Sequence, residues 1–100
     1  MVKGNQQEDI YGGMRVENKL LTIFNTYSKS HQVSKLLEEV GELIETIMNE
    51  DKENMVQELA DVEVMLLQFK EHYHINGNDI LKIMNEKIDR QLNRIDNKNK

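Results

Sequence analysis

The sequence predicts an all-α protein, a four-helix antiparallel bundle whose burial we expect a second chain to complete. The 100-residue chain contains no proline, and its apolar residues recur at spacings of three and four in four separate stretches. The polar breaks between these stretches are short, as in antiparallel helix bundles. We divide the chain into an N-terminal arm over residues 1–13, one helical domain over residues 14–95 and a polar tail over residues 96–100.

The composition restricts the possible functions. The chain has no cysteine, which excludes disulfides, zinc–thiolate sites and thiol nucleophiles. No apolar run approaches the length of a membrane span and no signal peptide is visible, so we expect a soluble, cytoplasmic protein with no membrane partner. A net charge of -5 argues against a nucleic-acid partner. The apolar content of 38% supports only a modest core, and we expect a homodimer or a homotetramer.

The first helix is expected over residues 14–28, where apolar residues return at helical spacing. Its Phe24 and Tyr27 could either join the core or stack on a nucleobase, and their helical spacing favours the core. The polar segment that follows contains Ser30, which we expect to cap the next helix.

The second helix is expected over residues 33–49. Its broad apolar stripe leaves Glu38 and Glu42 on the opposite side, whereas Glu39 lies on the shoulder of the stripe. Gly41 interrupts this helix with a poor helix-forming residue. Close helix packing and ligand contact both explain such a glycine, and packing is the more common reason.

The third helix is expected over residues 54–72. It is apolar nearly all round, which is typical of a central, buried helix. Glu58 and Asp61 stand between apolar neighbours, although acidic side chains are rarely buried without partners. Their position favours a metal site over a solvated charged face.

The fourth helix is expected over residues 80–95, with Asn78 or Asp79 as its N-cap. Its polar side carries Lys87, Arg90 and Arg94. Cations near a helix C-terminus are stabilised by the helix dipole, so these charges alone do not indicate a ligand. The apolar stripe consists of Ile80, Leu81, Ile83, Met84, Ile88, Leu92 and Ile95.

Two acidic pairs carry the main functional signal. Glu39-x-x-Glu42 and Glu58-x-x-Asp61 each have the spacing that places two side chains on one helical face, and fifteen residues separate the pairs. Gathered carboxylates repel one another, and hard divalent cations such as Mg²⁺ relieve that repulsion. From the spacing alone, a metal site and two solvated acidic faces both stay open.

The residues around these acids resemble those of a known family. Lys35-Leu-Leu-Glu-Glu-Val-Gly-Glu-Leu-Ile-Glu, with Gln57-Glu-Leu-Ala-Asp-Val downstream, is similar to the EExxE and ExxD signature of the MazG-like all-α nucleoside triphosphate pyrophosphohydrolases. The resemblance implies hydrolysis of an NTP or dNTP to the monophosphate and pyrophosphate, in nucleotide-pool clean-up or control. It implies Mg²⁺ as the cofactor, with Mn²⁺ as a substitute. The implied metal ligands are Glu39, Glu42, Glu58 and Asp61.

The resemblance extends to four further positions with less detail. Glu38 matches the motif, and its implied catalytic role as base, metal ligand or holder of an outer-shell water stays open. On the fourth helix the family uses a Lys and an Asn to meet phosphates or sugar. Lys87 matches, Gln91 stands where Asn is usual, and Arg94 follows. For Lys87, ligand contact and stabilisation by the helix dipole are equally good explanations. For Arg94 the helix dipole is the favoured one.

Other interpretations remain beside the enzyme. A helical interaction module could keep this fold without catalysis. A redox carboxylate protein would need the spacing Glu71-x-x-His74 on two helices, and it occurs once. We expect His31, His72 and His74 to be exposed, although His31 could also line a base pocket. The chain carries no P-loop, GxSxG, HExxH or EF-hand motif.

Overall fold

The computed structural model describes residues 13–99, and within them it contains four α-helices and no strand. The helices are α2 (Val16–Thr26), α3 (Lys29–Met48), α4 (Lys52–His72) and α5 (Gly77–Lys98). The prediction of an all-α protein with four helices is therefore confirmed. The arm predicted over residues 1–13 lies, apart from Gly13, outside the described residues, and α5 continues beyond the predicted helix end at Ile95.

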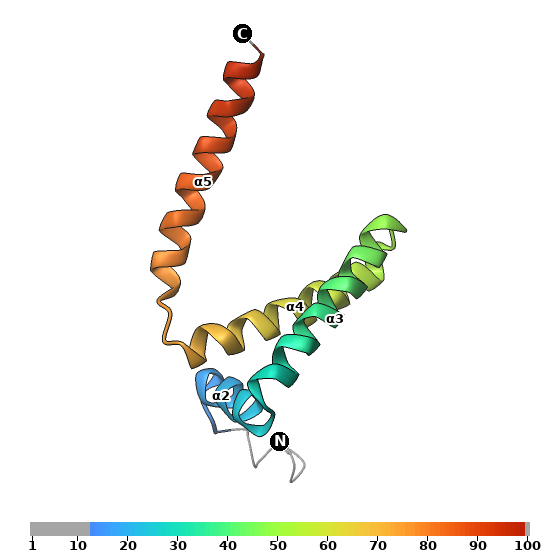
Figure 1. Ribbon diagram of the computed structural model, residues 1–100, viewed down its shortest axis with the longest axis vertical. Coiled ribbons are helices and arrows are strands. Elements are labelled where there is room, and N and C mark those ends of the chain that lie inside the picture. The colour runs from blue at the N-terminus through green and yellow to red at the C-terminus, as the bar shows by residue number, and fades with distance from the viewer. Residues whose placement is uncertain (1–12, 100) are drawn as a thin grey trace.

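Helices α3 and α4 form an antiparallel hairpin, and α2 packs against α4 (Figure 1). The core is small and lies where these helices meet. Phe24 is only 3% exposed. Its ring meets Phe69 edge-on at 5.2 Å and stacks on His72 at 4.2 Å between ring centroids. The buried apolar residues are Leu20, Phe24, Val62 and Met65.

The start of α3 differs from the prediction. Ser28 has an extended backbone, and its hydroxyl accepts a hydrogen bond from the backbone N–H of His31 at 3.1 Å. This is the geometry of an N-cap, so the helix begins at Lys29 rather than at residue 33. The prediction that Ser30 caps this helix is wrong, because Ser30 is already inside its first turn.

The next two helices also begin at polar caps. The Asp51 carboxylate accepts a hydrogen bond from the backbone N–H of Asn54, which starts α4. Asn76 starts α5, because its side-chain oxygen accepts a hydrogen bond from the backbone N–H of Asn78 at 2.7 Å. The predicted caps Asn78 and Asp79 are therefore wrong, since both lie in the first turn of α5.

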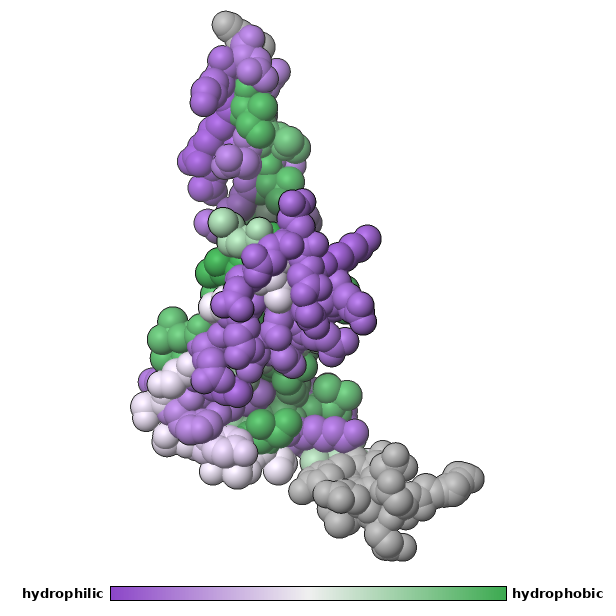
Figure 2. All heavy atoms as spheres, turned by 90° about the vertical axis from the view of Figure 1, so that its right-hand side faces the viewer, coloured by the Kyte–Doolittle hydropathy of each residue, from purple (hydrophilic) through white to green (hydrophobic). Residues whose placement is uncertain are grey.

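Helix α5 leaves the other three helices and extends away from them (Figure 1). None of its described residues is buried. Figure 2 shows apolar side chains at the surface along this projecting helix. Within one chain the described residues thus pack three helices together, and the stripe of α5 has no cover. The exposed stripe consists of Leu81, Ile83, Met84, Ile88, Leu92 and Ile95.

Helix α4 is central, as predicted, because it contacts both α2 and α3. It is not buried all round, since Val56, Leu59, Val64 and Leu67 are exposed on its outer face. Among the described residues, no helix has both the length and the apolar character needed to cross a membrane.

Candidate metal centre

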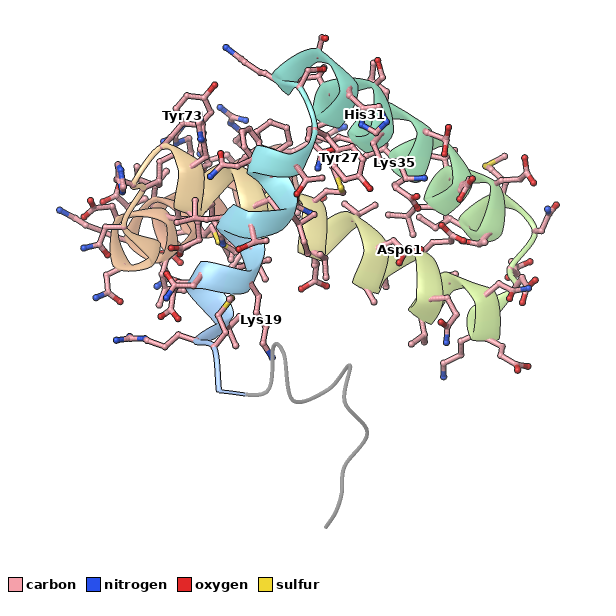
Figure 3. All side chains as sticks on the ribbon, turned by 90° about the horizontal axis from the view of Figure 1, so that it is seen from below. Lys19, Tyr27, His31, Lys35, Asp61 and Tyr73 are labelled. Carbon is pink, nitrogen blue, oxygen red and sulfur yellow. The ribbon has the colours of Figure 1, made fainter. Side chains whose placement is uncertain are left out.

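The hairpin of α3 and α4 brings acidic residues of both predicted pairs together. Glu39 on α3 and Glu58 and Asp61 on α4 each place one carboxylate oxygen within 4.8 Å of the others. Asp61 lies on the side of α4 that faces α3 (Figure 3). Two oxygens bound to one Mg²⁺ lie at most about 4.2 Å apart, so small side-chain movements would suffice to form a shared site.

Two oxygens of this cluster are buried without hydrogen-bond partners. They are Oε2 of Glu39 and Oε2 of Glu58, and the Glu39 residue is only 7% exposed. A buried carboxylate oxygen without a partner costs free energy, because it has lost its water. A divalent cation between the helices would be bound by both oxygens, which would then have a partner. The donor set of hard oxygens therefore fits a metal such as Mg²⁺.

The electrostatics of Glu58 show how tightly the acids are gathered. Burial raises the pKa of Glu58 above its ordinary value, and the hydrogen bonding and charge of Glu42 raise it further. The charges of Glu39 and Asp61 act in the same direction. Glu42 is exposed, yet it lies close enough to Glu58 to belong to the same acidic group.

Lys35 is a site residue that the sequence analysis did not single out. Its Nζ lies 3.0 Å from Oε1 of Glu38 and 3.3 Å from Oε1 of Glu39. These hydrogen bonds, the one to Glu38 first, raise the pKa of Lys35. The spacings of three and four along one helix could have revealed both pairs. Glu38 is exposed and paired with Lys35, so it stands beside the three-carboxylate cluster rather than in it.

The candidate substrate residues of the last helix lie elsewhere. Lys87, Gln91 and Arg94 are exposed on α5. Because α5 extends away from the α3–α4 hairpin, one chain does not bring these residues to the carboxylates (Figure 1).

The sequence of this helical region is that of a known protein family. A sequence model described as the MazG nucleotide pyrophosphohydrolase domain matches residues 28–95. This range begins at the cap of α3 and includes the whole acidic cluster. The chain belongs to the MazG family. No curated protein and no solved structure matches it.

Membership of the MazG family confirms the resemblance found in the sequence. It implies a hydrolase that acts on nucleotides, and the carboxylate cluster of this MazG chain could hold a metal.

A cavity of about 400 Å³ opens beside the acids of this MazG domain. Its wall includes Tyr27 and His31, whose rings stack at 4.7 Å with an interplanar angle of 13°. Figure 3 shows these two residues close to Lys35, which lies between them and the carboxylates along α3. The lining residues are Ile23, Tyr27, His31, Gln32, Lys35, Glu38, Met65 and Gln68.

The aromatic residues and histidines give a mixed outcome. Phe24 belongs to the core, as predicted, whereas the preference for a buried Tyr27 is wrong. Tyr27 follows the last residue of α2, and it is 50% exposed. His31 and His74 are exposed, as predicted. The prediction is wrong for His72, which is half-buried because it stacks on Phe24.

Proposed function

We propose that this MazG-family chain hydrolyses a nucleoside triphosphate, NTP or dNTP, to the monophosphate and pyrophosphate with Mg²⁺. The observation that supports this most is the pair of buried, unpartnered oxygens of Glu39 and Glu58 between two helices. The ions would be held by these two residues together with Glu42 and Asp61, and Mn²⁺ would serve as a substitute. The cellular role would be the clean-up or control of the nucleotide pool in the cytoplasm.

The chemistry follows from the charges that the site can offer. Bound Mg²⁺ would neutralise the triphosphate and lower the pKa of the attacking water. Water adds across the bond between the α- and β-phosphates, and pyrophosphate leaves. Glu38 stands at the exposed edge of the cluster, where its carboxylate can accept the proton of that water. Lys35 holds the Glu38 carboxylate at 3.0 Å and so fixes its position for this role.

The site is proposed to be completed by a second copy of the chain, as a homodimer or homotetramer. The exposed stripe of α5 and the apolar outer face of α4 need cover, and a shallow groove on α4 would accept another helix. The partner's α5 would bring Lys87, Gln91 and Arg94 to the triphosphate. The groove is lined by Val56, Leu59, Ala60, Glu63, Val64 and Leu67.

The test is pyrophosphate release from a panel of NTPs and dNTPs with Mg²⁺ and with EDTA. We expect pyrophosphate release in Mg²⁺ and none in EDTA. We also expect Glu42→Gln or Asp61→Asn to abolish the release while the chain stays folded. Glu45→Gln is the matched control, because Glu45 is an exposed acid on the same helix and lies outside the cluster. Near-normal rates in Glu42→Gln or in Asp61→Asn, or release that survives EDTA, would refute the carboxylate site.

The competing proposal is a helical interaction module without catalysis. The large apolar surface on α4 and α5 favours it, because such surfaces mark contacts with other proteins. A folded chain that releases no pyrophosphate from any nucleotide of the panel would support this alternative. The redox alternative gains no support, since within the described residues Glu71 and His74 do not join the carboxylate cluster.

A further inference from the structure

The cavity beside the acidic cluster is floored by two buried amides. Gln32 on α3 and Gln68 on α4 are each 2% exposed. Nε2 of Gln32 donates a hydrogen bond to Oε1 of Gln68 at 2.7 Å, so the pair joins the two helices of the hairpin. Neither residue belongs to the metal cluster, and both line the cavity.

The direction of this hydrogen-bond chain is fixed at one end by a sulfur atom. Nε2 of Gln68 lies 3.6 Å from Sδ of Met65, and a thioether can only accept. The Gln68 oxygen is therefore free to accept from Gln32, whose own oxygen lies 3.0 Å from Nδ1 of His31. Nδ1 of His31 then carries the proton, which orients the ring that stacks on Tyr27.

The chain leaves an excess of donors at the floor of the cavity. Each glutamine nitrogen has two N–H groups, and the described residues give each of these nitrogens one acceptor. For Gln68 that acceptor is a weak one, the sulfur of Met65. A ligand that presents a carbonyl oxygen to these amides would supply the missing acceptor. An amino group in the same place would set one hydrogen-bond donor against another.

The rest of the cavity suits a flat ring attached to phosphates. Its volume of about 400 Å³ falls within the range of small-molecule sites. The stacked rings of Tyr27 and His31 form an aromatic wall on one side. At the other end lie Lys35 and Glu38, next to the carboxylates at which the phosphates would be held. A nucleotide can thus place its base in the cavity and its phosphates at the metal centre.

We propose that this cavity binds the nucleobase of the substrate and selects bases that carry an exocyclic carbonyl oxygen. The base stacks on the outer face of the Tyr27–His31 pair, and the Gln32–Gln68 pair donates N–H groups to its carbonyl. The selected bases are uracil, thymine, cytosine, guanine and hypoxanthine, and adenine is disfavoured because it has no carbonyl. The inference rests on the proposed function, since it names the substrate class of the same site.

The first test compares kcat/KM for UTP, GTP and ITP with that for ATP. We expect the wild type to prefer the three carbonyl-bearing bases, and we expect Gln32→Met or Gln68→Met to reduce that preference about 10- to 100-fold, because a hydrogen-bond donor is lost. Methionine has a similar length and is apolar, and circular dichroism checks that each variant folds. A wild type that prefers ATP, or a preference that both folded variants keep, would overturn the proposal.

A second test needs neither metal nor turnover. Uridine, inosine or adenosine is titrated into the ¹⁵N-labelled wild type with EDTA, and the side-chain amide signals of Gln32 and Gln68 are followed by NMR. We expect uridine and inosine to shift these signals and adenosine to leave them unchanged. Selective shifts without any hydrolysis would uphold the base site and refute the proposed function. Metal-dependent hydrolysis with no shift of these amides would overturn the base site alone.

The aromatic wall has a matched control within the chain. Tyr27 and Tyr73 are 50% and 48% exposed, and Tyr73 lies away from the cavity at the end of α4 (Figure 3). We expect Tyr27→Ala to raise KM for the preferred nucleotide about tenfold, because base stacking is lost. Tyr73→Ala should leave KM unchanged. Equal effects of the two variants would contradict a stacking role for Tyr27.

Discussion

At the scale of single residues, Glu58 links the acidic cluster to the stability of the fold. Burial and the neighbouring acids, Glu42 foremost, raise its pKa in the folded chain above the ordinary value of 4.5. In the pH interval above 4.5 the folded state thus holds a proton that the unfolded state has already released. The free energy of unfolding then falls as pH rises through this interval.

This gives a prediction for the metal-free chain. In EDTA, Glu58→Gln should be more stable than the wild type, and the difference should grow as pH rises from 4.5 through the raised pKa of Glu58. The amide cannot ionise, so it avoids the repulsion that the carboxylate meets. Urea unfolding of both chains between pH 4 and 8 measures the difference. A difference that shrinks with rising pH would show that Glu58 is stabilised as a carboxylate.

How far single residues can be predicted depends on what surrounds them. The position of Glu39 at the edge of the apolar stripe follows from the periodicity of one helix, and the residue is indeed buried beside Asp61. The exposure of Tyr27 depends instead on where α2 ends relative to α4. The amide pair of Gln32 and Gln68 joins residues 36 positions apart, and no local pattern in the sequence indicates such a contact.

At the scale of elements, α3 contains a glycine in its interior that the described residues do not explain. An added Cβ at Gly41 would meet no atom within 4 Å, so the close packing favoured from the sequence is absent within one chain. Glycine costs a helix interior about 1 kcal/mol relative to alanine.

We therefore expect Gly41→Ala to raise the free energy of unfolding of the isolated chain by about 0.5–1 kcal/mol. For a domain of this size the melting temperature should rise by about 2–8 °C, measured by calorimetry. A lower melting temperature would contradict the open surroundings of Gly41 and place another chain against α3.

The elements themselves were predictable, whereas their ends were less so. Each helix carries apolar residues at a helical spacing, and that signal is long and strong. Several nearby polar residues, such as Ser28 and Ser30, can serve as the N-cap of α3, and the sequence alone does not distinguish them. Backbone geometry decides it, because only the residue with an extended backbone at the helix start can cap.

At the scale of the whole molecule, the unpacked position of α5 is the main feature. Its apolar stripe was visible in the sequence, and a stripe shows that a helix must be covered. The stripe does not show which surface covers it. In the described residues that cover is not supplied by α2, α3 or α4, so the arrangement of α5 could not be predicted from its own pattern.

The proposed assembly makes a prediction that combines two variants. If α5 of one copy serves the carboxylates of another, Asp61→Asn damages a site in its own chain and Lys87→Ala damages the site of the partner. Each variant alone should have little activity. Mixed after unfolding and refolding together, they should form dimers in which one site has both groups intact, and pyrophosphate release should return to about a quarter of the wild-type rate. Mixing either variant with itself is the control. No recovery, although light scattering shows that mixed dimers form, would mean that Lys87 acts within its own chain or not at all.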